Sequence, residues 1–225
     1  MWNRVSTRTR KGEAIARLTV ALVALAGFGT LFGNFADEVI EKNTLYADEA
    51  VLKYINGFAT PWLDQLMIVL TSFGGVLAVV TATTILTVLY ARRNMWRASL
   101  FASFSIGGLL LVNSILKVFY QRERPELWDL LVNEATYSFP SGHSALSFGL
   151  ALIVCILLWH SRWRWFSLGV AIVYVVAIGF TRLYLGVHYP TDVLAGWLLA
   201  IVWVGTVGVL AGVIPVGKVT RLLKR

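Results

Sequence analysis

Six long stretches without a charged side chain dominate this sequence. They cover residues 18–36, 65–91, 98–116, 135–161, 165–181 and 193–217. A helix rises about 1.5 Å per residue, so about 20 residues cross the roughly 30 Å hydrocarbon layer of a membrane. The alternative, a soluble protein with buried helices, would keep polar residues at a 3.6-residue period, whereas these stretches are apolar on every face. The sequence therefore predicts an all-α integral membrane bundle of six transmembrane helices.

We expect the spans to form one domain over residues 1–225. They are placed at about 18–36, 65–91, 98–116, 141–159, 165–181 and 193–213. Only 14% of the residues are charged, which is well below the value for soluble domains. The first span follows a basic segment, as a signal peptide would, but it is longer than the roughly 7–15-residue signal core, and "FGNFADE" is a poor cleavage site. We expect this span to be retained.

Basic residues are distributed unevenly between the two ends of the predicted bundle. By alternation of six spans, 14 of the 20 Lys and Arg residues fall on one side: Arg4, Arg8, Arg10, Lys11, Arg17, Arg92, Arg93, Arg97, Arg162, Arg164, Lys218, Arg221, Lys224 and Arg225. Glu13 is the one acidic residue among them. The positive-inside bias makes this side cytoplasmic, with both termini. The net charge of +8 thus reflects topology, and we expect no nucleic-acid partner.

The segment 37–64 connects the first two spans on the outer side. Its apolar residues recur at a loosely helical spacing, which favours an amphipathic helix on the outer membrane surface. A simple tethering loop fits the pattern about equally well. We assign this segment no chemistry.

Three polar stretches are predicted to lie on the same outer face, because successive spans cross the membrane in alternating directions. Lys117 and Arg124 follow the third span in "KVFYQRERP", "PSGH" opens the fourth, and "TRLYLGVHYPTD" joins the fifth to the sixth. The cluster comprises Lys117, Arg124, Ser141, Gly142, His143, Arg182, His188 and Asp192. Ionisable residues next to a membrane are energetically costly, so such a cluster indicates function.

The chemistry of this cluster suits a tetrahedral oxyanion, with phosphate as the leading candidate. Lys117, Arg124 and Arg182 supply three positive charges, and guanidinium groups bind such anions bidentately. Ser141 and Gly142 precede a predicted helix N-terminus, where backbone N–H groups and the helix dipole favour an anion. We therefore expect these five residues to hold a phosphate.

Two histidines in one anion pocket suggest a division of labour, in which one attacks phosphorus and the other protonates the leaving oxygen. Asp192 follows His188 by four residues and could accept its ring N–H, which orients the ring and raises its nucleophilicity. His188 is then the better candidate for the nucleophile and His143 for the acid. We interpret His160, on the other side, as an interfacial residue beside the aromatic belt of Trp163 and Trp165.

The remaining charges of the loop after the third span are interpreted as solvated loop charges or local ion-pair partners. They are Arg122, Glu123, Glu126, Asp129 and Glu134.

The three stretches resemble signatures of a known family. "KVFYQRERP" fits Lys-x6-Arg-Pro, "PSGH" matches fully, and "TRLYLGVHYPTD" fits Ser-Arg-x5-His-x3-Asp except that Thr181 stands at the first position. In these three signatures the sequence resembles the type 2 phosphatidic acid phosphatase superfamily. This superfamily includes membrane lipid phosphatases, glucose-6-phosphatases and vanadium haloperoxidases. Three signatures in matching order and spacing make the resemblance specific.

The resemblance implies a lipid phosphatase of the bacterial plasma membrane that forms a phosphohistidine at His188, with its site on the outer side. It implies no metal and no cofactor. The expected substrates are undecaprenyl diphosphate, phosphatidylglycerol phosphate or phosphatidic acid. The alternatives are a lipid A phosphatase or phosphotransferase and, less consistent with six spans and two histidines, a haloperoxidase-like enzyme, a transporter or a non-catalytic lipid-binding protein.

Overall fold

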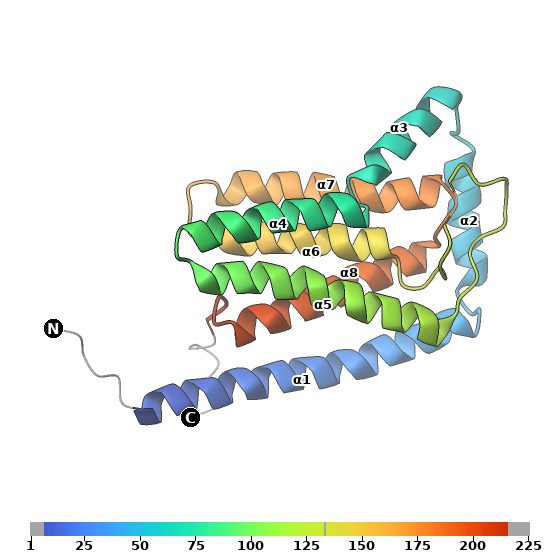
Figure 1. The fold of residues 1–225 in the computed structure, drawn as a ribbon. Coiled ribbons are helices and arrows are strands. Elements are labelled where there is room, and N and C mark those ends of the chain that lie inside the picture. The colour runs from blue at the N-terminus through green and yellow to red at the C-terminus, as the bar shows by residue number, and fades with distance from the viewer. Residues whose placement is uncertain (1–6, 133, 216–225) are drawn as a thin grey trace.

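The computed structural model describes residues 7–132 and 134–215, with side chains from residue 12 onward. Within these residues the chain is helical and contains no strand (Figure 1). In chain order the helices are α1 Thr7–Ile40, α2 Leu45–Asn56, α3 Pro61–Ser72, α4 Val76–Arg92, α5 Trp96–Tyr120, α6 Gly142–Leu158, α7 Arg164–Tyr184 and α8 Pro190–Leu210. The predicted all-α fold is confirmed.

Apolar helices match the predicted spans. Five segments of the described chain are long and apolar enough to cross a membrane: Gly12–Ile40, Pro61–Arg92, Trp96–Tyr120, Arg164–Tyr184 and Pro190–Leu210. The sixth, α6, is a shorter apolar helix of 17 residues. Helices α1 and α7 carry many exposed large apolar side chains, as expected for surfaces in contact with lipid.

The second predicted span differs from the expectation of one continuous helix over 65–91. It consists of α3 and α4, which are separated by a turn at residues 73–75, and α3 projects away from the bundle at an angle to α4 (Figure 1). A Cβ at Gly74 would collide with the side chain of Ile178 in α7. Tyr174 of α7 also donates a hydrogen bond to the carbonyl of Phe73 at 2.8 Å. Close contact with α7 therefore accompanies the break.

Helix α2 crosses the end of the bundle within the segment that joins the first two spans (Figure 1). The helical alternative for segment 37–64 is thus correct in its middle, whereas the first residues belong to α1 and the last to α3. Leu52 and Ile55 are buried. So is Asp48, at 2% exposure, which a purely interfacial helix would not require.

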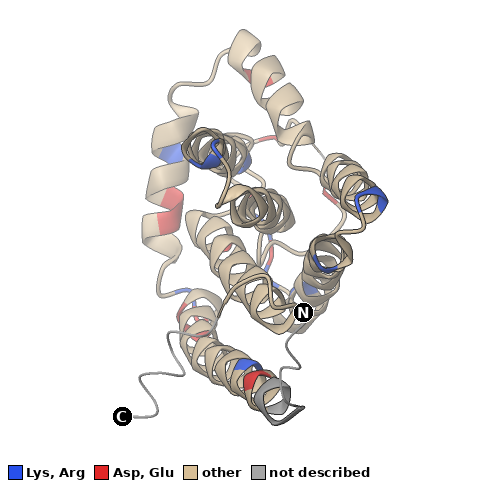
Figure 2. Cartoon of the chain, turned by 90° about the vertical axis from the view of Figure 1, so that its left-hand side faces the viewer, with Lys and Arg blue, Asp and Glu red and all other residues tan. Residues whose placement is uncertain are grey.

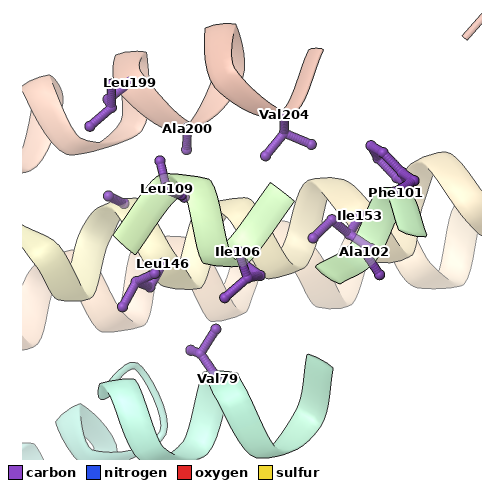
Figure 3. Close-up of a cluster of buried hydrophobic side chains, with 11 residues drawn as sticks. Val79, Phe101, Ala102, Ile106, Leu109, Leu146, Ile153, Leu199, Ala200 and Val204 are labelled. Carbon is purple, nitrogen blue, oxygen red and sulfur yellow. The ribbon is translucent and has the colours of Figure 1, made fainter. Parts of the chain in front are cut away.

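The core lies between α4, α5, α6 and α8 (Figure 3). Its fully buried members include Val79, Phe101, Leu109, Ile153 and Val204. Small residues let α6 and α8 approach closely, since a Cβ on Gly196 would lie 2.6 Å from the carbonyl oxygen of Ser141. Close packing through small residues is typical of membrane helices. This contact positions the start of α6 beside the start of α8.

The two ends of the bundle differ in charge. The start of α1, the α4–α5 and α6–α7 connections and the end of α8 lie together at one end (Figure 1), which Figure 2 views directly and which carries basic residues at several helix ends. Of the basic residues expected at this end, Arg4, Lys218, Arg221, Lys224 and Arg225 lie outside the described residues, as do the side chains of Arg8, Arg10 and Lys11.

Candidate active site

The three polar stretches meet at the end of the bundle opposite the basic loops. The backbone N–H of Ser141 donates to the carbonyl of Asp192 at 3.0 Å, which joins the starts of α6 and α8. The N–H of Ser138 donates to the carbonyl of Arg122 at 2.8 Å. Both are backbone hydrogen bonds, so the three stretches are held together independently of side-chain contacts.

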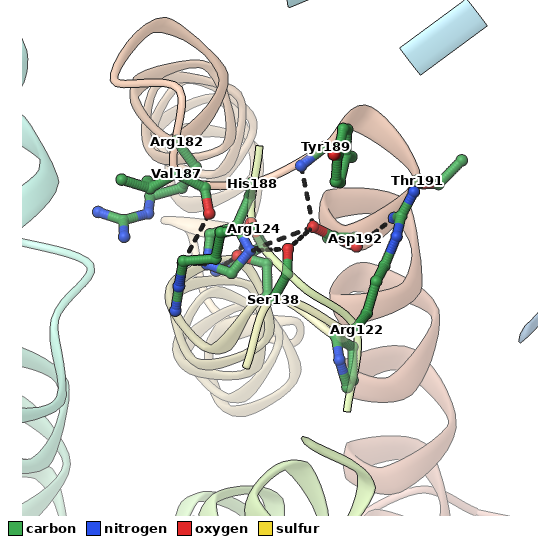
Figure 4. Close-up of polar contacts among 12 residues, drawn as sticks. Arg122, Arg124, Ser138, Arg182, Val187, His188, Tyr189, Thr191 and Asp192 are labelled. Carbon is green, nitrogen blue, oxygen red and sulfur yellow. Dashed lines mark hydrogen bonds and ion pairs between the residues drawn. The ribbon is translucent and has the colours of Figure 1, made fainter. Parts of the chain in front are cut away.

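His188 and Asp192 form the centre of the site (Figure 4). The Nδ1 atom of His188 lies 3.3 Å from Oδ2 of Asp192, and Nε2 lies 3.3 Å from Nη1 of Arg124. Both partners are buried, with His188 1% exposed and Asp192 0%. The tautomer with the proton on Nδ1 satisfies this network, and it leaves the lone pair of Nε2 facing Nη1 of Arg124.

Asp192 accepts hydrogen bonds from several groups besides His188. The hydroxyl of Ser138 and the backbone N–H of Tyr189, the latter at 2.9 Å, donate to Oδ2. Oδ1 contacts Nη1 of Arg122 at 2.5 Å. A buried carboxylate needs such donors to remain ionised, and an ionised Asp192 is what a supporting partner of His188 requires.

Arg182 is the most deeply buried cation of the site, at 1% exposure. Its Nη1 donates to the hydroxyl of Thr71 in α3 at 2.7 Å, and its Nη2 pairs with the carboxylate of Glu134. The Nε atom is buried without an acceptor among the described residues. Buried donors are rarely left unpaired, so this N–H fits the binding of an additional acceptor such as a phosphate oxygen.

Arg124 and Lys117 lie on the other side of His188. Arg124 donates to the carbonyl oxygens of Thr136 and Val187 at 2.8 and 2.6 Å. Lys117 donates to the carbonyl of Tyr137. A Cβ at Gly142 would lie 4.0 Å from Cε of Lys117, so the ammonium stem runs beside the start of α6.

The first turn of α6 is anchored by Ser141. Ser141 is the N-cap, its hydroxyl accepts from the Ser144 N–H at 3.4 Å, and its own N–H is bonded to Asp192. Ser141 therefore fixes the start of the helix, and Gly142 and His143 carry the first N–H groups, which have no partner within a helix. The Nε2 atom of His143 faces Gly75 in the α3–α4 turn, 3.5 Å from where a Cβ would stand.

Ionisation in the loops around the site follows from burial and neighbouring charge. Burial, and then the charges of Arg182, Arg124 and Lys117, hold the pKa of His188 well below its usual 6.5. Burial alone would raise the pKa of Glu134, but nearby positive groups, Arg182 first among them, outweigh it and lower the pKa. His188 is thus neutral and Glu134 anionic near pH 7.

A cavity of about 630 Å³ opens beside these residues, between the last turns of α5 and the loop that follows. Lys117, Arg124 and Glu134 line it together with apolar and polar neighbours such as Val118 and Tyr137. Glu134 also pairs with buried Arg182 and lies 3.7 Å from Arg124. Its carboxylate therefore occupies the position where the two guanidinium groups can share one anion.

Several residues gain a role that the sequence did not indicate. Arg122 was expected to be a solvated charge or a local ion-pair partner, but its side chain is 8% exposed and pairs with Asp48 and Asp192, which are distant in sequence. Glu134 is an ion-pair partner, as one alternative had it, but of the two phosphate-binding arginine candidates. Burial next to opposite charge is the signal, and it is visible only in the fold.

Two other expectations concern residues at the margins of the site. Thr181, at the position where the family signature has Ser, donates its hydroxyl to the carbonyl of Ile178 at 2.7 Å and is buried. This hydroxyl is used within α7. His160 is exposed in the α6–α7 connection, next to exposed Trp159 and at the end of the bundle away from the site.

The comparison with known proteins agrees with this geometry. The sequence model described as the PAP2 superfamily matches residues 98–211. The chain belongs to this superfamily. It is 32% identical to phosphatidylglycerophosphatase B of Bacillus subtilis over 69% of this chain and 78% of that protein. It is 29% identical to an undecaprenyl-diphosphatase of Sulfolobus acidocaldarius over 77% and 83%.

A solved structure shares the PAP2 fold. The crystal structure of a transmembrane PAP2-type phosphatidylglycerolphosphate phosphatase from Bacillus subtilis superposes with a TM-score of 0.73 at 30% identity, covering 81% of this chain and 92% of that one. The protein is therefore a membrane-embedded phosphatase of the PAP2 superfamily. Helices α1 to α4 lie before the matched domain, and α2 and α3 nevertheless supply Asp48 and Thr71 to its polar network.

Proposed function

We propose that the protein hydrolyses a phosphomonoester or diphosphate of a membrane lipid through a phosphohistidine formed on His188. One observation carries the proposal: the imidazole is buried between Asp192 at Nδ1 and Arg124 at Nε2, each at 3.3 Å. This arrangement presents a neutral nitrogen lone pair to a group that binds anions. The PAP2 membership supports the same chemistry.

In the first step, Lys117, Arg124 and Arg182 hold the phosphate oxygens, assisted by the N–H groups at the start of α6. Nε2 of His188 attacks phosphorus as the bond to the lipid oxygen breaks. The electron pair of that bond leaves with the oxygen, and His143, which is protonated when the negative phosphate is bound beside it, donates a proton to that oxygen. The bond from His188 Nδ1–H to Asp192 stabilises the positive charge that develops on the ring.

In the second step, His143, now neutral, removes a proton from a water molecule that attacks the phosphohistidine. The bond between phosphorus and Nε2 breaks, inorganic phosphate leaves, and both histidines return to their starting states. The three cations stabilise the spread of negative charge on the phosphoryl oxygens in each transition state. No group of three or more His, Cys, Asp or Glu in the described parts of the chain is placed to hold a metal ion.

The substrate class is inferred from the cavity and from the relatives. The cavity of about 630 Å³ adjoins the end of α5, so a phosphate on a lipid could reach it from the membrane surface. The named relatives act on phosphatidylglycerophosphate and undecaprenyl diphosphate, and we propose these and phosphatidic acid as the substrates. Lipid A is the alternative. Apolar tails are distinguished weakly by packing, so one site could accept several.

We further propose that the protein lies in a bacterial plasma membrane with both termini in the cytoplasm and the site on the outer side. The basic residues at the end opposite the site support this orientation. Green fluorescent protein fused to the C-terminus tests it, because the fusion fluoresces only in the cytoplasm. A full-length fusion that does not fluoresce would indicate the opposite orientation.

Phosphate release from lipid phosphates in detergent tests the mechanism. His188→Ala is expected to abolish release while lipid binding is retained, and His160→Ala, at the opposite end, serves as the matched control with wild-type activity. Addition of EDTA is expected to leave the rate unchanged. Activity that survives His188→Ala, or that disappears with EDTA, would contradict the mechanism.

Substrate choice is tested by measuring kcat/KM side by side for phosphatidylglycerol phosphate, undecaprenyl diphosphate, phosphatidic acid and lipid A. We expect the first three to be hydrolysed. Exclusive hydrolysis of lipid A would favour the alternative, and turnover of none of them would remove the proposed substrate class.

A further inference from the structure

Asp48 of α2 is buried and fully engaged, although it lies on a helix that crosses the outer end of the bundle. Its Oδ1 accepts from the backbone N–H of Thr191 at 3.1 Å. Its Oδ2 accepts from the Thr191 hydroxyl at 2.6 Å and from Nη2 of Arg122 at 2.9 Å. The residue lies 143 positions before Thr191 and outside the matched family domain, which begins at residue 98.

Arg122 connects Asp48 to the centre of the site. One end of its guanidinium contacts Asp48, and the other contacts Oδ1 of Asp192 at 2.5 Å and the hydroxyl of Thr191 at 2.9 Å. The group also stacks 4.1 Å from the ring centre of Tyr189. A planar guanidinium held at both ends and on one face has a single orientation, as Figure 4 shows for its contacts with α8.

The charge balance of this group decides what Asp48 contributes. If Arg122 interacted with Asp192 alone, its positive charge would neutralise more of the carboxylate charge that stabilises protonated His188. With Asp48 on its other side, the same guanidinium is shared between two carboxylates. Interactions between buried charges are strong because little water screens them, so removal of one carboxylate strengthens the pull of Arg122 on the other.

We propose that Asp48 is a positioning residue for the nucleophile: acting through Arg122, it fixes Asp192 and preserves the ability of Asp192 to support His188. This inference rests on the proposed function of His188. It gives α2 a part in the reaction although no residue of α2 lines the cavity. The direction of the effect depends on every charged group that faces His188, namely Asp192, Arg124, Arg182, Lys117, Glu134 and His143, with Arg122 and Asp48 behind Asp192.

Two variants of opposite charge change test the proposal in the full-length protein. Asp48→Asn keeps the shape and removes one negative charge, so His188 should become harder to protonate and less nucleophilic. We expect kcat to fall by about 10- to 100-fold, the range seen when the hydrogen-bond partners behind metal-binding histidines are removed, with KM unchanged. The acid limb of the pH profile of kcat/KM should move to lower pH. Arg122→Gln should move it to higher pH.

The matched control is Glu49→Gln, which makes the same change at the next residue of α2, where Glu49 forms an exposed pair with Lys53 at 2.9 Å. It should keep the wild-type kcat and pH profile. All variants are measured with the same substrate, so any ionisation of the substrate affects every pH profile equally and cannot explain a difference between variants. Thermal unfolding in detergent identifies loss of folded protein, which would lower the apparent kcat without moving the pH profile.

The outcomes separate this inference from the function on which it rests. If His188→Ala is inactive but Asp48→Asn matches Glu49→Gln in kcat and pH profile, Asp48 has no positioning role and the proposed function stands. If His188→Ala remains active, the proposed function fails first. If Arg122→Gln does not fold, the shift of the acid limb in Asp48→Asn alone decides.

Discussion

Arg182 forms an ion pair with Glu134, which lines the cavity, and the arginine side chain is 1% exposed whereas the glutamate side chain is 24% exposed. Arg124 approaches the same carboxylate at 3.7 Å. A side chain of the protein therefore holds the position that two phosphate-binding candidates would offer to a substrate. A phosphate that binds both arginines must displace Glu134 or share them with it.

Glu134→Gln is expected to tighten the binding of inorganic phosphate, because the competing negative charge is gone and the arginines keep theirs. The inhibition constant for phosphate should fall several-fold. Without phosphate, the variant should unfold at a lower temperature, since Arg182 loses its counterion, and added phosphate should raise its unfolding temperature more than that of the wild type. Glu126→Gln, in the same cavity wall, is the control. Equal phosphate affinity in both variants would contradict this competition.

The lowered pKa of His188 makes stability depend on pH with a definite sign. Burial and neighbouring cations keep His188 neutral in the folded protein, whereas in the unfolded chain it titrates near 6.5. Because the unfolded state then binds the extra proton, stability is complete above pH 6.5 and is lost as the pH falls below it. Between pH 7.5 and 5.5 the wild type should lose on the order of 1 kcal/mol more than His188→Gln. Unfolding in detergent at the two pH values measures the difference, and equal losses would mean that His188 is not held neutral.

Asp192→Asn should reduce kcat by about 10³- to 10⁴-fold, as loss of the carboxylate partner does for other catalytic histidines. The amide can donate to Nδ1 and so favours the wrong tautomer, with the proton on Nε2. Release of the dephosphorylated lipid under single-turnover conditions checks this, because that product leaves in the step that forms the phosphohistidine. A rate within tenfold of the wild type would show that Asp192 does not support His188.

The close contact of α6 with α8 predicts that Gly196→Ala is damaging. The new Cβ would stand 2.6 Å from the carbonyl of Ser141, a backbone atom that cannot move alone. We expect a loss of about 1–3 kcal/mol of stability and reduced kcat, since α6 carries His143. Gly205→Ala on the same helix meets open space and should be neutral or slightly stabilising. Thermal unfolding and phosphate release are measured for both variants. Equal stability and equal activity of the two would contradict the close contact at Gly196.

Thr181→Ser restores the residue that the family signature has at this position, and it should change activity little. The hydroxyl of Thr181 bonds to the carbonyl of Ile178 within α7, and serine can make the same bond. The loss of one buried methyl group should cost on the order of 1 kcal/mol of stability. A marked change in KM for the lipid would show that the hydroxyl acts on the phosphate instead.

The membrane fold and the location of the motifs follow from the sequence alone. Span length is a local property, because about 20 apolar residues in succession cross a bilayer wherever they occur. Alternation of the spans then assigns every loop to an end of the bundle, which brings Lys117, His143 and His188 to one face without any knowledge of packing. The resemblance of the three stretches to family signatures indicated their chemistry.

Other features were decided only by tertiary packing. The break between α3 and α4 lies at Gly74 and Gly75, a pair that favours a turn, but the sharp change of direction is accompanied by the close approach of α7 at Gly74, which a count of uncharged residues does not reveal. Arg122, which looked like a loop charge, lies between Asp48 and Asp192, which are 74 and 70 residues away. Burial and charge pairing between residues this far apart depend on which helices pack together, and a local sequence pattern does not indicate that packing. The sequence therefore specifies which residues reach the site's end of the membrane, and the packing of the helices selects those that act on His188.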